Sequence, residues 1–108
     1  RAAPSARTVV VSGVPAGLLS DDVVTDLLCI HFQMPRNNGG DVEKVVYPTV
    51  EKGVAYILFE DPEVVENVLK KDDHQLKDKR LPGYHPLKVT RCCEVVSPFV
   101  IYLFIYPL

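Results

Sequence analysis

The sequence predicts an α+β domain in which two helices cover one face of a four-stranded antiparallel sheet. Three observations favour this fold class: β-branched runs bounded by turn residues, two apolar series at helical spacing, and a strand–helix–strand–strand–helix–strand order. The chain has 108 residues, of which 47% are hydrophobic and 24% charged. These totals fit a single globular domain with one two-layer core.

The N-terminal part of the chain contains the first predicted strand and helix. Residues 1–6 are small and polar and predict a flexible arm. The β-branched run 8–12 predicts a strand, with Val10 on the face opposite that of its two valine neighbours. Ser20 is a suitable helix cap, and apolar residues at helical spacing after it predict a helix over 21–33.

The remainder of the domain predicts three more strands and a second helix. Residues 42–47 and 52–59 form the second and third strands, and Asp61 caps the helix that follows. The turn-rich stretch 74–85 is long enough for a small hairpin, and alternation over 87–91 predicts the fourth strand. This is the ferredoxin-like β-α-β-β-α-β order, with sheet order 4-1-3-2 and one face of the sheet free of helices.

Nothing in the sequence favours catalysis, a cofactor or a metal, so we expect a protein that is not an enzyme. Nucleophile elbows, P-loops, dinucleotide fingerprints and HExxH motifs are absent. His31 belongs to the apolar stripe of its helix, which favours a packing role over that of a base. Three cysteines without framework or zinc spacing (Cys29, Cys92 and Cys93) indicate a reduced, intracellular protein.

Alternation along the strands predicts which side chains occupy the helix-free face. These are apolar or neutral (Val10, Val46, Val54, Tyr56, Leu58 and Thr90) or basic (Lys44 and Lys88), with Lys52 and Arg91 nearby. One aromatic ring and a few cations can stack a base and contact phosphates. The net charge of −2 excludes a broadly basic nucleic-acid binder but leaves room for a local basic patch.

The third predicted strand carries a family motif. KGVAYILF, residues 52–59, resembles the RNP1 motif of the RNA recognition motif family, [KR]-G-[FY]-[GA]-[FY]-[VIL]-x-[FY], except that Val54 replaces an aromatic residue. VVVSGV, residues 9–14, lies where the family has RNP2, with Val10 in place of a second aromatic residue. The resemblance implies weak binding of single-stranded RNA on the sheet face.

The family resemblance also implies a role for each candidate residue. Tyr56 would stack on a base, with Val10 and Val54 as weak apolar substitutes for the two missing rings. The basic residues would contact phosphates: Lys44, Lys52, Lys88 and Arg91.

A second resemblance points to protein contacts. The GGDVE turn and the FEDPEVVENVL helix start are similar to domains of the N-myc interactor and the interferon-induced leucine-zipper protein group. Those domains share the fold but are associated with protein–protein contacts. The resemblances therefore support an RNA-binding module, with a protein-interaction domain as the alternative.

The domain is expected over residues 7–91, followed by an apolar tail over 92–108. The run PFVIYLFIYPL is about half as long as a membrane-spanning helix, so no membrane span is expected. The tail could lie across the helix-free face, bind a partner or mediate self-association, or have no settled structure. The sequence leaves these alternatives open.

Overall fold

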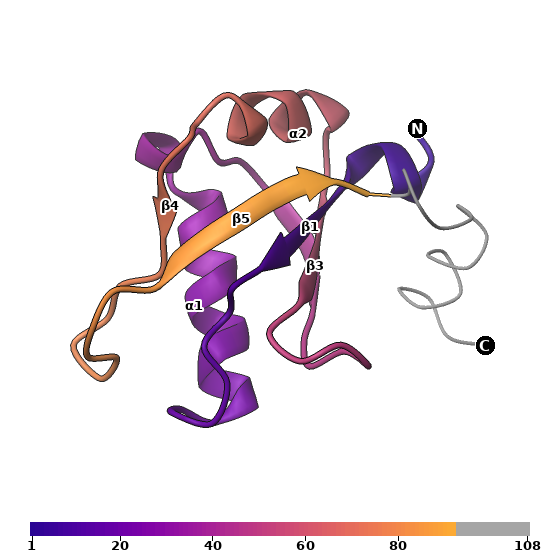
Figure 1. Ribbon diagram of the computed structural model, residues 1–108. Coiled ribbons are helices and arrows are strands. Elements are labelled where there is room, and N and C mark those ends of the chain that lie inside the picture. Colours follow the sequence, from indigo (N-terminus) through magenta and orange to yellow (C-terminus); the bar gives the residue numbers. More distant parts are fainter. Residues whose placement is uncertain (93–108) are drawn as a thin grey trace.

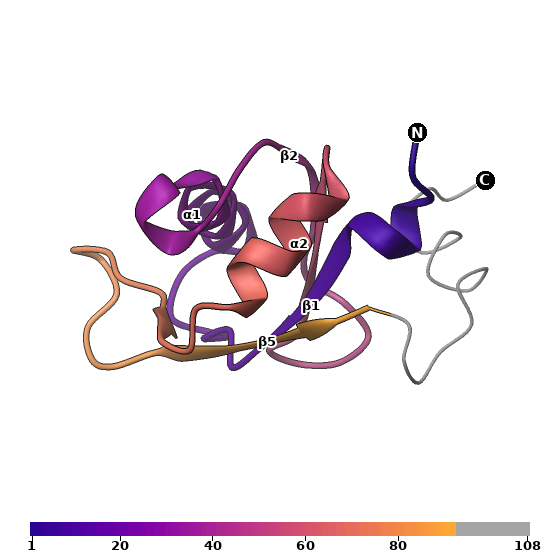
Figure 2. The same cartoon turned by 90° about the horizontal axis from the view of Figure 1, so that it is seen from above.

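The computed structural model describes residues 1–92, and the predicted tail from residue 93 onward lies outside them. Two helices, α1 (Asp21–Gln33) and α2 (Pro62–Leu69), lie on the same side of an antiparallel sheet (Figures 1 and 2). The strands are β1 (Thr8–Ser12), β2 (Val42–Val46), β3 (Ala55–Phe59), β4 (His74–Gln75) and β5 (Pro86–Arg91). Short 3₁₀ turns, η1 (Pro4–Arg7) and η2 (Pro35–Asn37), precede β1 and follow α1.

The strand order β2-β3-β1-β5-β4 confirms the predicted 4-1-3-2 arrangement, because β5 is the predicted fourth strand. The number of strands was predicted wrongly, since β4 adds a fifth at the edge. Its two residues pair with Leu87 and Pro86, and the Leu76 amide donates to the carbonyl of His85. The hairpin expected over 74–85 therefore exists, but its second strand is the start of β5.

Both helices begin where their caps predict. The Ser20 hydroxyl accepts a hydrogen bond from the amide of Val23, and the Asp61 carboxylate accepts one from the amide of Glu63. These side chains satisfy amides that have no partner within the helix. Each cap thus fixes the residue at which its helix starts over the sheet.

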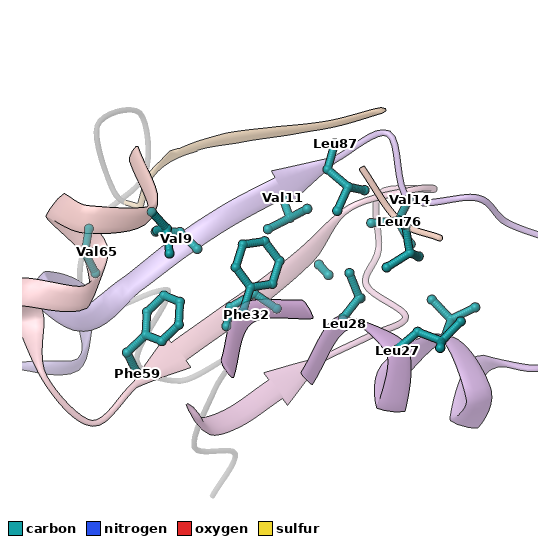
Figure 3. Close-up of a cluster of buried hydrophobic side chains, with 14 of the residues drawn as sticks. Val9, Val11, Val14, Leu27, Leu28, Phe32, Phe59, Val65, Leu76 and Leu87 are labelled. Carbon is teal, nitrogen blue, oxygen red and sulfur yellow. The ribbon is translucent and has the colours of Figure 1, made fainter. Parts of the chain in front are cut away.

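The core lies between the helices and the inner face of the sheet (Figure 3). Val9, Val11, Ile57 and Phe59 are fully buried there, as the alternation predicted. The ring of Phe32 from α1 meets the ring of Phe59 edge-on, with centroids 6.2 Å apart.

The N-terminal segment is attached to the sheet, unlike the flexible arm that its composition predicts. Arg7 is only 3% exposed, and its guanidinium donates to the carbonyls of Ala2 and Phe59 and to the carboxylate of Glu43. A buried charge is tolerated only when it is paired and hydrogen-bonded, and Arg7 meets both conditions.

Candidate nucleic-acid interface on the sheet

We define the helix-free face as the outward side chains of the four long strands: Thr8, Val10, Ser12, Lys44, Val46, Tyr56, Leu58, Lys88 and Thr90. Strand register arranges them in rows, because directly paired residues point to the same side of a sheet. Both helices lie on the opposite side (Figure 2). A ligand could reach these side chains where they are exposed, which excludes the buried Thr8 and Leu58.

The central row contains the ring predicted to stack. Tyr56 on β3 is paired with Val10 on β1 and with Val46 on β2, and Thr90 lies beyond Val10 on β5. Tyr56 is partly exposed, and it packs with both valines against Leu58. The ring thus lies on an apolar strip, as the alternation predicted, and its phenol belongs to the helix-free face.

A second row closes one end of this face. Leu58 is paired with Thr8 on β1 and Lys44 on β2, and it is fully buried although it points away from the helices. Cys92 packs against Leu58 and is itself 8% exposed. The sequence predicted Leu58 as an outward residue, and its direction is right, but its side chain offers no surface to a ligand.

The third row carries positive charge at the other end of the strands. Lys88 on β5 is exposed and paired with Ser12 at the end of β1. Lys52 is exposed in the turn that precedes β3. Gly53, next to it, has φ +74, and a β-carbon there would lie 3.1 Å from the carbonyl oxygen of Val14. A glycine is therefore required at the position where the motif has one.

A bulge in β2 decides which way Lys44 points. Val42 pairs with Phe59 and Lys44 pairs with Leu58, so one residue of β2 is extra between these two pairs. Val42 consequently packs on the core while Lys44 lies on the helix-free face. Without the bulge the two side chains, two residues apart, would share a face.

For two of the predicted contact residues, the position expected from the sequence is wrong. Val54 lies in the turn before β3 and is 7% exposed, and the Thr49 hydroxyl donates to its backbone carbonyl at 2.9 Å. Arg91 is paired with Val9 and therefore points to the helix side. There its guanidinium donates to the Glu66 carboxylate of α2, with one contact of 2.6 Å. Neither residue extends the helix-free face.

The histidine on α1 has the packing role that its apolar stripe predicts, with a partner that the sequence did not indicate. His31 Nε2 lies 2.9 Å from Nδ1 of His74, whose Nε2 lies 2.8 Å from the carbonyl oxygen of Val68. A carbonyl only accepts, so Nε2 of His74 carries a hydrogen, and in the neutral His74 ring Nδ1 then accepts from Nε2 of His31. Burial, then the neighbouring His74, Lys71 and Arg36, lower the pKa of His31 to about 4.

Metal binding and membrane insertion find no support within the described residues. Over residues 1–92, no three His, Cys, Asp or Glu side chains come together as a metal site. None of the helices in that range is long and apolar enough to cross a bilayer.

A comparison with known protein families agrees with this geometry. The family model described as the third RRM domain of PARP14 matches residues 6–96, which is most of the chain. The chain therefore belongs to the RNA recognition motif family, whose members are RNA-binding modules in general.

Proposed function

We propose that this member of the RNA recognition motif family binds single-stranded RNA weakly on its helix-free face, with Tyr56 stacking on a base. The observation that carries the proposal is the position of Tyr56 in the central row, between Val10 and Val46. Among the outward strand residues of the described chain, Tyr56 alone is aromatic. Stacking on one ring contributes about 1–3 kcal/mol per base, so a single ring supports modest affinity.

The basic residues add a contribution that depends on salt. Lys52 and Lys88 are exposed at the end where β1 finishes and β3 begins, and Lys44 lies at the opposite end of the face. Phosphate contacts from these lysines would release counterions, so binding should weaken as salt rises. The RNA would then run across the Tyr56 row, from Lys52 and Lys88 at one end of the face to Lys44 at the other.

A titration of the isotope-labelled chain with a short single-stranded RNA tests this proposal. We expect amide shifts on β1 and β3, and we expect Tyr56→Ala to weaken binding by roughly 5- to 150-fold, the range that corresponds to one stacked base. Tyr56→Phe should preserve most of the affinity because it keeps the ring. Tyr84, which is 68% exposed in the loop before β5, provides the matched control Tyr84→Ala.

Three results would count against RNA binding on this face. The first is the absence of shifts at low salt. The second is a set of shifts that Tyr56→Ala leaves unchanged. The third is an equal loss of affinity in Tyr56→Ala and Tyr84→Ala, which would indicate non-specific stacking.

The second candidate function is a protein-interaction domain that uses the same face. It is favoured by the partly exposed apolar strip of Val10, Val46 and Tyr56, and by the acidic pI of about 5.9. Self-association through this face would broaden amide lines as the protein concentration rises in the absence of RNA. Val10→Lys would abolish the broadening, whereas an RNA-binding face would tolerate the added cation.

We also propose a specific relative, a non-catalytic role and an intracellular location for this domain. The stretches RTVVVSGVP, FQMPRNNGGDVEKVVYPT and KGVAYILFEDPEVVENVL resemble the vertebrate protein called RNA-binding protein 43. On this basis we propose a binding module rather than an enzyme. The few cysteines, without framework spacing, favour an intracellular setting.

A further inference from the structure

A groove of about 440 Å³ lies on the helical side of the molecule, away from Tyr56. One wall is the C-terminal half of α1 with residues 36–37, and the other is the segment 71–78 that leads through β4. No residue of the helix-free face lines it. Its size falls within the range of small-ligand pockets, about 300–1,000 Å³.

The groove carries positive charge in a molecule whose net charge is −2. Arg36 lines it from the wall that contains α1, and Lys71 and Lys77 line it from the segment 71–78. Within residues 1–92 none of these three side chains has an ion-pair partner. Their charges are therefore available to an anionic ligand.

The two acidic residues of the groove are already engaged. Asp78 accepts hydrogen bonds from the Arg80 guanidinium at 2.7 and 3.2 Å and from the Arg80 amide, which hold the pKa of its carboxyl at about 2. Asp73 accepts a hydrogen bond from the Gln75 amide at 2.9 Å. With Asp78 neutralised by Arg80, the side chains around the groove retain a positive balance.

Two of the cations affect a buried histidine that lines the groove. His31 lies there, 7% exposed, and both Lys71 and Arg36 disfavour its protonation. Such an effect requires the two positive charges to be close to the imidazole. Arg36 and Lys71 thus line the same groove as the His31 imidazole, from opposite walls.

The α1 wall is apolar. Leu27 and Ile30 line this wall from α1 and Met34 lines it from directly after the helix, and Ile30 is 53% exposed. A large aliphatic side chain that is half exposed beside cations suits a ligand with a flat apolar part and an anionic part. Nucleotides combine these two properties.

We propose that this groove binds a small phosphate-bearing ligand of the mononucleotide class, with the base against α1 and the phosphate between Arg36, Lys71 and Lys77. This site is independent of the RNA-binding proposal, since it shares no residue with the helix-free face. The cations are largely exposed, so the attraction is partly screened and the dissociation constant should be in the region of ~1 mM.

Titration of the labelled 108-residue chain with adenosine monophosphate tests the site. We expect amide shifts at residues 27–37 and 71–78. Adenosine and inorganic phosphate, which each lack one half of the ligand, should bind several-fold more weakly. Lys71→Gln should weaken binding of the nucleotide several-fold, and Asp73→Asn should strengthen it.

The matched control is Lys70→Gln, because Lys70 is exposed next to Lys71 but does not line the groove. Bound phosphate should also raise the pKa of the His31 imidazole, which its ring proton shifts report. Tyr56→Ala should leave nucleotide binding unchanged, which separates a failure of this site from a failure of RNA binding.

The proposal would be overturned by any of three results. One is the absence of shifts at roughly ten times the expected dissociation constant. Another is an equal effect of Lys70→Gln and Lys71→Gln, which would show a response to net charge only. A third is the appearance of nucleotide-induced shifts on β1 and β3 instead of around the groove.

Discussion

The two faces of β3 differ although their residues alternate along five positions of one strand. On the inner face Ala55, Ile57 and Phe59 are all fully buried under the helices. On the outer face Leu58 is buried beside Cys92, whereas Tyr56 remains partly exposed. The inner face thus supplies stability, and the outer face keeps one ring accessible.

Because of this difference, substitutions at neighbouring residues of β3 should change different properties of the domain. A substitution on the inner face, or at the buried Leu58, should lower the free energy of unfolding, whereas a substitution of Tyr56 should change binding. Neighbouring residues of β3 are about 3.3 Å apart along the strand, so only their direction separates the two effects. Single substitutions on each face can therefore measure the two effects separately.

Phe59→Ala tests the inner face most severely. It removes a fully buried ring that meets Phe32 edge-on, and such truncations cost about 3–5 kcal/mol of unfolding free energy. Urea denaturation measures the loss. Because small domains have only about 5–15 kcal/mol in total, Phe59→Leu serves as a milder variant that should fold. A loss below about 1 kcal/mol for Phe59→Ala would contradict the core assignment.

The core under the inner face also contains a buried histidine, His31 of α1, which should make the free energy of unfolding depend on pH. Its pKa is about 4 in the folded chain, mainly because of burial, against about 6.5 for an unperturbed histidine. Between these values the unfolded chain binds more protons. Stability is therefore fully present above pH ~6.5 and decreases as pH falls toward 4.

Urea unfolding at pH 7 and pH 5 measures this effect, and we expect a loss of about 2 kcal/mol over that range. The range stays above the pKa of ordinary carboxyl groups. His31→Gln should flatten the dependence, whereas His85→Gln should retain it, since within residues 1–92 the His85 ring hydrogen-bonds only the nearby carbonyl of Pro82. Equal slopes in the two variants would show that other groups titrate.

The faces of regular strands could be predicted from the sequence because side-chain direction there follows a period of two. Val10 and Tyr56 were placed correctly by alternation alone. Arg91 was misplaced although it lies two residues after Val89, so the same period already assigns it to the helix side. Its positive charge suggested a phosphate contact, but the structure pairs it with Glu66.

Other features depend on contacts that are distant in sequence. Val54 is buried in the turn before β3, where Thr49 donates to its carbonyl, and no periodicity indicates this. His31 and His74 are 43 residues apart, and only the docking of β4 beside α1 brings their rings together. The groove beside them was missed for the same reason, because Arg36 is distant in sequence from Lys71 and Lys77. A cluster of that kind has no spacing signal in a single sequence.

Val10→Phe tests whether RNA affinity is limited by the number of aromatic rings on the outer face and not by access to that face. Val10 is paired directly with Tyr56, so a phenylalanine there would add a second stacking surface beside the first. We expect RNA affinity to rise by about 1–3 kcal/mol, measured by fluorescence anisotropy with a labelled oligonucleotide. Val10→Leu, which adds apolar volume without a ring, is the control. An equal gain in both variants would indicate an apolar contact without stacking.

The smallest effects should come from two cations on β5 that differ in direction. Lys88 lies on the outer face, paired with Ser12, whereas Arg91 lies on the helix side, paired with Glu66. Lys88→Gln should weaken RNA binding and reduce the slope of affinity against salt by about 0.7, the value for one phosphate contact on a single strand. Arg91→Gln changes the net charge equally, yet it should leave that slope unchanged because the side chain points away from the RNA. Affinities measured at several salt concentrations for both variants decide the matter. If the two slopes fall together, the RNA responds to the total charge of the domain, and the distinction between the faces has no part in binding.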